Sequence, residues 1–292
     1  MDRFLFLTFD GLARGAVLAA FALSLVLIWR AARIVNFAQG AMAVSATYVA
    51  FMVTAATDSY WAGLAAALAA GFVIGATVER GVMRHVSGAS PLNTVIAGLG
   101  VLMVLQAVLG MIFGNGYRTM DAPFSGEPVE ILGVSAVSSY DLFVFACICA
   151  VVLALMLLFT RTRLGLQLRA AAFAPELARL LGVRSRRMLT LGWALSSALG
   201  ALAALLLIPT EFGLNPHAAD TVFVYAFTVA VVGGLDSPGG AVVGGLAVGV
   251  LLSWVSGYLG AVLAPVAILL LLLAVLLLRP SGLFSLAKER AA

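Results

Sequence analysis

The sequence predicts an all-α fold, a polytopic transmembrane helical bundle with about eight or nine spans, some of them short or broken. Of its 292 residues, 63% are hydrophobic and only 10% are charged, and the mean hydropathy is +1.12. Soluble domains carry about 25% charged residues. The apolar runs are continuous and roughly 18–21 residues long, as membrane-spanning helices require, whereas a transmembrane barrel needs alternating segments of about ten residues.

Polar, proline or glycine residues separate the apolar runs. The expected spans are 11–29, 40–57, 61–82, 93–113, 141–160, 188–208, 221–232, a glycine-rich span ending near residue 257, and 261–278. As a helix, 221–232 is about 18 Å long, against roughly 30 Å of hydrocarbon. It either crosses as a short helix, which gives nine spans, or re-enters, which gives eight.

The distribution of basic residues predicts the orientation. With the N-terminus outside and nine crossings, fourteen of the seventeen lysines and arginines fall on the cytoplasmic side, and Arg3, Arg14 and Arg118 are the exceptions. Lysine and arginine favour cytoplasmic loops, so this count predicts an outside N-terminus and a cytoplasmic C-terminus. Residues 114–140 then form a periplasmic loop.

The loop 161–187 holds seven arginines and a single acid, and is expected to be cytoplasmic. Pro175 suits the first position of a helix, Glu176 suits its first turn, and Gly182 suits its end. Leucines at 177, 180 and 181 form one apolar face. The pattern predicts a short amphipathic helix over 175–181, which is either a handle for a cytosolic partner or a connector lying among lipid headgroups.

Three polar or glycine-rich interruptions break the apolar sequence at 36–40, 90–94 and 233–245. Irregular backbone at membrane depth must be buried in protein or line a wet cavity. Asn36, Gln39 and Asn93 are therefore candidates for a translocation pathway, although each could also cap a helix at the inner interface. A separate structural role, shaping a broken helix, is expected for Gly40, Gly233, Gly234, Pro238 and Gly240.

Several functions are disfavoured. Away from the ends of the spans there is no charged residue or histidine of the kind that ion-coupled transporters bury. No catalytic pair or metal-ligand cluster is visible, so we expect neither an enzyme nor a bound metal. The segment GLDSPGG (234–240) lacks the Lys-Ser/Thr ending of a phosphate-binding loop, so the chain is not expected to bind ATP. No nucleic-acid partner is expected either.

Several stretches carry a family resemblance. They are RIVNFAQGAMAVSATYVAF (33–51), VERGVMRHV (78–86), NTVIAGLGVLMVLQ (93–106), the arginine-rich loop with its sequel (165–207), AFTVAVVGGLDSPGGAVVGGLAVG (226–249) and RPSGLF (279–284). The chain resembles the branched-chain amino acid ABC importer permeases of the LivH type.

The resemblance implies a single permease domain over 1–292 in a bacterial inner membrane, with a homologous second permease subunit, two cytosolic ATPase subunits that bind ATP, and a periplasmic binding protein. The loop helix would be the coupling helix that contacts an ATPase, through Ala172, Pro175, Glu176, Arg179, Leu180 and Gly182. Two departures bear on detail: Phe173 and Ala174 stand where relatives often have polar or acidic residues, and Gln39 stands where they often have histidine.

The expected cargo is a branched-chain or other hydrophobic amino acid, because the resemblance points there. Three alternatives remain open. The same class of importer could carry urea or short amides. A stand-alone channel or facilitator would need no ATPase, and a secondary transporter would need a site for a coupling ion.

Overall fold

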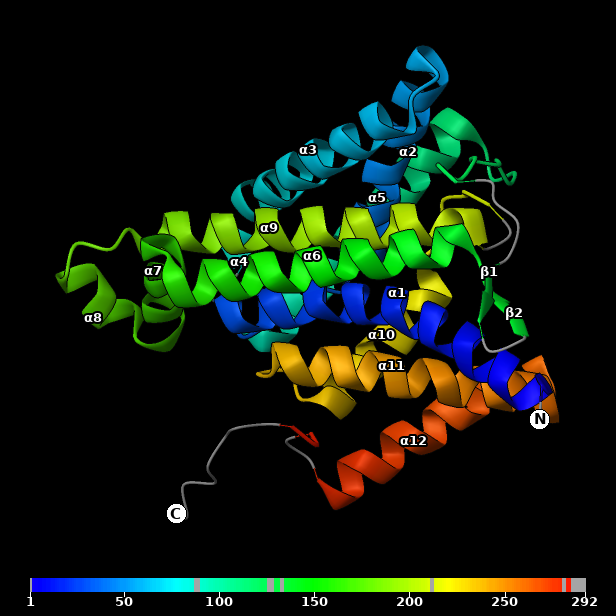
Figure 1. Cartoon of the computed structure of the whole chain (residues 1–292). Helices are drawn as coiled ribbons and strands as arrows, with labels where there is room; N and C mark the ends of the chain where they lie inside the picture. Colours follow the sequence, from blue (N-terminus) through cyan, green and yellow to red (C-terminus); the bar gives the residue numbers. More distant parts are fainter. Residues whose placement is uncertain are drawn as a thin grey trace. The chain divides into compact units, whose positions relative to one another are not determined.

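The computed structural model describes residues 2–86, 90–124, 129–131, 134–210, 213–279 and 282–284, and nearly all of them are helical (Figure 1). Among these residues, eight helices are long and apolar enough to cross a membrane, and Asp220–Gly233 forms a shorter apolar helix. The predicted α-helical membrane bundle is confirmed. Residues 125–128, Lys288 and Arg290, which entered the sequence argument, lie outside the described residues.

The elements follow the expected order. The helices are α1 (Asp2–Ala32), α2 (Gln39–Thr57), α3 (Tyr60–Val78), α4 (Arg84–Val86), α5 (Pro91–Phe113), α6 (Ser139–Arg161), α7 (Arg163–Phe173), α8 (Pro175–Leu180), α9 (Ser185–Leu207), α10 (Asp220–Gly233), α11 (Pro238–Trp254) and α12 (Ala264–Leu278). π-helical turns at Glu79–Met83 and Val255–Leu259 prolong α3 and α11, and 3-10 turns occupy Ile208–Thr210 and Ala261–Leu263.

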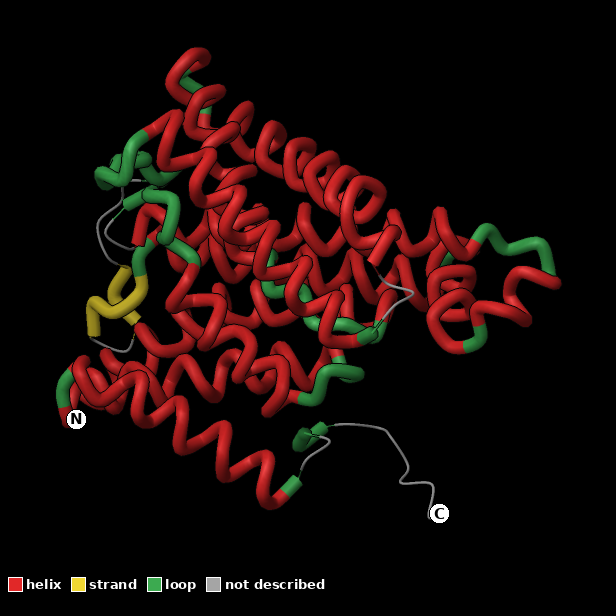
Figure 2. Tube along the Cα trace, turned by 180° about the vertical axis from the view of Figure 1, so that it is seen from behind, coloured by secondary structure: helices red, strands yellow, loops and turns green. Residues whose placement is uncertain are grey.

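Three expectations about local structure were wrong or incomplete. The loop 161–187 contains a second helix, α7, which the sequence argument missed. The loop between α5 and α6 contains a two-stranded antiparallel hairpin, β1 (Val129–Ile131) and β2 (Val134–Val137), drawn in yellow in Figure 2. The first helix starts at Asp2 and is 31 residues long, whereas a span of 11–29 was expected.

Hydrogen bonds from the end of α11 explain the early start of α1. Ser253 Oγ donates to Asp10 Oδ2 at 2.8 Å, and Trp254 Nε1 donates to Thr8 Oγ1 at 3.2 Å. Arg14 pairs with Asp10 one helical turn away, at 3.1 Å. The contacts with α11 satisfy the polar side chains of Thr8 and Asp10, which lie before residue 11, the predicted start of the span.

The chain packs as two compact units. The α9 unit comprises Leu27–Ala122 and Ala150–Phe223, and the α11 unit comprises Met1–Val26, Pro123–Cys149 and Val224–Ala292. In the α9 unit, α3 lies along α9, where Gly71 and Gly75 meet the backbone of the partner helix. A cluster of five buried residues in this unit holds Ile28, Ala38, Met42, Met83 and Trp193.

In the α11 unit, glycines bring the first half of α1 against α11. A Cβ placed on Gly15 would lie 2.7 Å from the carbonyl oxygen of Gly245, and one placed on Gly249 would overlap the Cα of Gly15. Lipid tails are as apolar as leucine side chains, so helix association in a bilayer depends on close van der Waals contact of this kind.

We expect Gly249→Ala to destabilise the purified chain by about 1–3 kcal/mol, because the new methyl group would force α1 and α11 apart. Gly100→Ala is the matched control. A Cβ at Gly100 meets no described atom within 4 Å, and alanine favours the helix by up to about 1 kcal/mol. Thermal unfolding in detergent measures both changes, and equal midpoints for the two variants would contradict the packing argument.

Candidate functional site

The arginine-rich loop is a folded element built on the end of α6. Thr162 Oγ1 accepts a hydrogen bond from the backbone N–H of Gly165 at 3.0 Å and caps the start of α7. A Cβ on Gly165 would overlap the backbone at Leu158 and Phe159, so only glycine lets α7 fold back against α6 so closely. Figure 1 shows α7 and α8 beyond one end of α9.

A Schellman motif ends α8. The N–H of Gly182 donates to the carbonyl of Arg179 at 3.0 Å, and the N–H of Val183 donates to the carbonyl of Ala178 at 2.9 Å. Gly182 has φ +82°, in the left-handed region that this motif requires and that glycine adopts without strain. The helix covers 175–180, against 175–181 expected from the sequence. Its end is therefore fixed by backbone geometry.

The leucines of α8 are not covered by the described part of the chain. Leu177 is 62% exposed, and Leu180 and Leu181 are each 84% exposed, whereas Ala178 is 2% exposed. Glu176 and Arg179 form a loose ion pair at 3.8 Å. Of the other predicted coupling residues, Ala172 is half-buried at the end of α7, and Pro175 is the first residue of α8.

The polar interruption at 36–40 is anchored to α9. Gln39 Nε2 donates to the carbonyl of Ser196 at 2.9 Å, and Asn36 Nδ2 donates to Gln39 Oε1 at 2.8 Å. Gln39 is 0% exposed and Asn36 is 1% exposed. A Cβ on Gly200 would overlap the Gln39 amide, so glycine makes room for this side chain. Ser196 lies eleven residues into α9, about 16 Å along it, so the anchor sits near the middle of the helix.

Asn93 is not part of this amide network. It is an exposed residue in the first turn of α5, and its backbone N–H donates to the capping Ser90 Oγ at 3.3 Å. The structure thus brings two of the three candidate pathway residues together and places the third elsewhere. The pathway role of all three stays a prediction.

A half-buried ion pair joins Glu79, which is fully buried, to Arg84, whose side chain is 33% exposed. The sequence had predicted only that Glu79 lies at the end of a span. Arg84 contacts the Glu79 carboxylate with Nε at 3.1 Å and Nη2 at 2.8 Å. Thr190 Oγ1, from the second turn of α9, donates to Glu79 Oε2 at 2.7 Å. Glu79 is 0% exposed. An acid five residues before an arginine at the end of an apolar run was the available signal.

The connector between α9 and α10 packs into the α9 unit and is not confined to its surface. Leu214 is fully buried and pairs with Arg118 through two backbone hydrogen bonds of 2.8 and 2.9 Å. Gln106 Nε2 donates to Asp220 Oδ1 at 2.8 Å, and His217 Nδ1 lies 3.0 Å from Asp220 Oδ2. Asp220 and His217 are both exposed. None of these three side chains was predicted from the sequence to have a role.

The helix α10 is short. Gln106, which bonds the first residue of α10, lies seven residues before the end of α5, so α10 begins beside the interior of α5 and not beside its end. Its 14 residues span about 21 Å, less than roughly 30 Å of hydrocarbon. That this helix crosses the membrane stays a prediction.

The glycines expected to shape a broken helix are found at the junction of α10 and α11. A Cβ on Gly233 or on Gly240 would overlap the backbone of the other residue. Gly234 has φ +91°, and Pro238 is in the first turn of α11. By contrast, a Cβ on Gly40 would make only ordinary contacts, the nearest at 3.5 Å from Ala219.

Among the described residues, no group of three or more histidine, cysteine, aspartate or glutamate side chains is arranged to hold a metal ion. The chemistry of the site lies in amides, one half-buried ion pair, one exposed His–Asp pair and an uncovered apolar helix.

Comparison with known proteins identifies the relatives. Residues 7–279 match the family described as branched-chain amino acid transport system / permease component. The chain is 29% identical to the high-affinity branched-chain amino acid transport system permease protein LivH of Escherichia coli K12 over 289 residues, 94% of this chain and 93% of LivH. It is 29% identical to the corresponding protein BraD of Pseudomonas aeruginosa over 287 residues, with the same coverage.

A solved structure shares the fold. A chain of PsaBC from Streptococcus pneumoniae, determined in complex with a Fab, superposes with a TM-score of 0.51 at 15% identity, covering 96% of this chain and 92% of that one. At this identity the similarity concerns the fold alone.

We expect Arg84→Met to lower the free energy of unfolding by about 3 kcal/mol, because it leaves the Glu79 carboxylate buried without a guanidinium. The double variant Glu79→Gln/Arg84→Met removes both charges and should lose less. Arg80→Met, at an exposed neighbour, is the control and should change stability by less than about 0.5 kcal/mol. Glu79→Gln alone supplies the second single loss, and a double variant that loses the sum of the two single losses would show that the pair is not coupled.

Proposed function

Because the chain belongs to the family of permease components of branched-chain amino acid transport systems, we propose that it is a membrane subunit of an ATP-driven importer for branched-chain amino acids. It pairs with a homologous permease subunit in a bacterial inner membrane, with its N-terminus outside and its C-terminus in the cytoplasm. Two cytosolic ATPase subunits hydrolyse ATP, and a periplasmic binding protein delivers the amino acid. This chain carries no catalytic step and no cofactor of its own.

The uncovered leucine face of α8 is the observation that carries this proposal. Leu177, Leu180 and Leu181 are largely exposed, although fully burying one leucine side chain is worth about 1.5–3 kcal/mol. The Schellman bonds hold the end of this helix. The loop that carries it lies between two long apolar helices, α6 and α9. A fixed apolar face in an arginine-rich cytoplasmic loop suits a protein groove, and the charges of Glu176 and Arg179 at its edge would orient the partner.

The α9 helix supports the transmission of movement from α8. Only Arg184 separates the Schellman motif from Ser185, the first residue of α9, so a displaced α8 would pull on α9. Thr190 binds the Glu79–Arg84 pair and Ser196 binds Gln39. A force from an ATPase on α8 would therefore reach the buried interruption in mid-membrane through one continuous helix.

The pair His217–Asp220 supports a polar route for the amino acid. An exposed carboxylate beside the interior of a membrane-spanning helix is costly unless it meets water or a polar partner. Gln106 holds one oxygen of Asp220, and a charged ammonium group is the kind of partner that suits a carboxylate. We assign Asp220 to the pathway together with the earlier candidates Asn36, Gln39 and Asn93.

Uptake into membrane vesicles tests the proposal. The chain is co-expressed with the neighbouring ATPase, second permease and binding protein, and uptake of leucine, isoleucine and valine is compared with that of urea, with and without ATP. We expect uptake of the branched-chain amino acids that requires both ATP and the binding protein. A preference for urea would show that the substrate is not a branched-chain amino acid. Uptake by this chain alone without ATP would show that it is a facilitator and not an importer subunit.

The coupling role predicts that Leu180→Glu lowers ATP-driven uptake more than tenfold while the chain remains in the membrane. A charge buried against a partner subunit costs about 2–5 kcal/mol, and each 1.4 kcal/mol corresponds to a factor of ten. The conservative Leu180→Met keeps the apolar face and should transport normally. The charge exchange Glu176→Lys/Arg179→Glu should also uncouple transport. Normal uptake by both Leu180→Glu and the charge exchange would show that α8 is not the coupling contact.

A further inference from the structure

The helix α7 carries a partly apolar stripe that the described part of the chain leaves uncovered. Leu166 is 60% exposed and Phe173 is 85% exposed, and Arg169, which lies between them, is exposed as well. These positions are spaced i, i+3 and i+7, so they lie along one side of the helix. Gly165 and Leu168, on another side, are buried. None of the functions argued above uses the exposed stripe.

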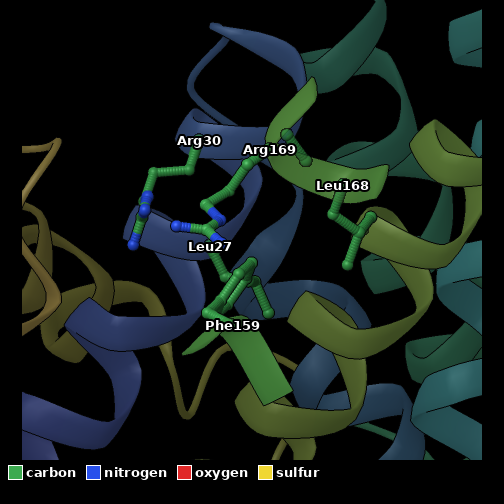
Figure 3. Close-up of a pocket in the computed structure, with 7 residues that line it drawn as sticks. Leu27, Arg30, Phe159, Leu168 and Arg169 are labelled. Carbon is green, nitrogen blue, oxygen red and sulfur yellow. The ribbon is translucent and has the colours of Figure 1, made fainter. Parts of the chain in front are cut away.

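The start of α7 is fixed at the level of the last turn of α6. A Cβ on Gly165 would overlap the carbonyl oxygen of Leu158 and the Cα of Phe159, and Phe159 lies two residues before the end of α6. Further along α7, Leu168 and Arg169 line a narrow pocket together with Phe159 (Figure 3). Since α6 is long and apolar enough to span a membrane, α7 begins where such a helix would leave the lipid.

The charge of α7 is of one sign. The helix holds Arg163 and Arg169, both exposed, and no acidic residue. The neighbouring α8 differs, because Glu176 and Arg179 balance each other and form an ion pair at 3.8 Å. A basic helix with exposed leucine and phenylalanine side chains fits an anionic lipid surface, with its arginines reaching the headgroups. The electrically neutral α8 gains nothing from such a surface.

We propose that α7 lies in the cytoplasmic face of the bilayer and binds anionic lipid headgroups. Leu166 and Phe173 would enter the outer part of the acyl chains, and Arg163 and Arg169 would lie at the phosphates. The two helices of the loop then have different partners, a lipid surface for α7 and a protein for α8. Only Ala174 separates Phe173 from the first residue of α8, so the lipid contact would set the height of α8 above the membrane.

Thiol labelling of the purified full-length chain in lipid nanodiscs tests the proposal. Cys147 and Cys149 are first replaced by alanine, and Phe173→Cys is compared with Leu180→Cys, because the two native side chains are 85% and 84% exposed. In nanodiscs of phosphatidylglycerol and phosphatidylcholine, a charged maleimide should react about tenfold more slowly at position 173, because Leu166 still holds α7 in the lipid. Labelling rates after unfolding in denaturant correct for any intrinsic difference between the two thiols.

Charge variants test the contribution of the headgroups. In the Phe173→Cys chain, Arg163→Gln/Arg169→Gln should remove most of the protection, since each basic residue near an anionic surface contributes about a factor of five. The control Arg184→Gln/Arg186→Gln removes the same charge from exposed positions outside α7 and should change the labelling rate less than about twofold. Nanodiscs of phosphatidylcholine alone should also lose most of the protection.

Three results would contradict the proposal. Equal corrected rates at positions 173 and 180 would show that α7 does not lie in the lipid. Protection of position 173 that appears only after the ATPase is added would assign α7 to a protein partner. Protection that persists in phosphatidylcholine alone, or in the Arg163→Gln/Arg169→Gln chain, would show that α7 does not bind anionic headgroups. The proposal uses the orientation of the chain given above, but labelling requires no transport, so the lipid contact can fail while the importer function stands.

Discussion

The backbone between α1 and α2 interrupts two apolar helices, and the rest of the α9 unit depends on how the polar groups of this interruption are satisfied. A bilayer offers no hydrogen-bond partners, so these groups must find them within the protein. The buried Gln39 supplies the link, because its amide bonds both Asn36 and the main chain of α9. Gly200 provides the space for that amide. The interruption at 36–40 is thus a fixed joint between α2 and α9.

The α9 helix connects the parts that a coupled transporter needs. It begins just after α8, binds the half-buried Glu79–Arg84 pair near its start, and holds the Gln39 joint near its middle. Each attachment is a short polar contact in apolar surroundings, where hydrogen bonds resist competition from water. Movement applied to α8 would therefore be delivered to two defined positions, one near the start of α9 and one near its middle.

The sequence predicted this fold well where apolar runs are long and where turn residues have a single use. The helix at 175–180 is an example, since Pro175 and Gly182 fit its ends. It failed where long-range contacts decide. The start of α1 depends on Ser253 and Trp254, which lie more than 240 residues away. Buried Glu79 is bonded by Thr190, and Asp220 is bonded by Gln106 of α5, more than 100 residues away in each case. Short-range sequence patterns do not reveal partners that lie so far apart in the chain. The roles of the candidate site residues remain predictions.

Site-directed cross-linking tests the central claim, that α8 is the contact with an ATP-hydrolysing subunit. Cys147 and Cys149 are free in the structure and would first be replaced by alanine. Leu180→Cys is then compared with Val262→Cys, which is also highly exposed but is placed on the periplasmic side by the proposed orientation. The account predicts a cross-link from position 180 to the ATPase and none from position 262. A complex that transports without any cross-link at 180, or that cross-links at 262, would contradict it.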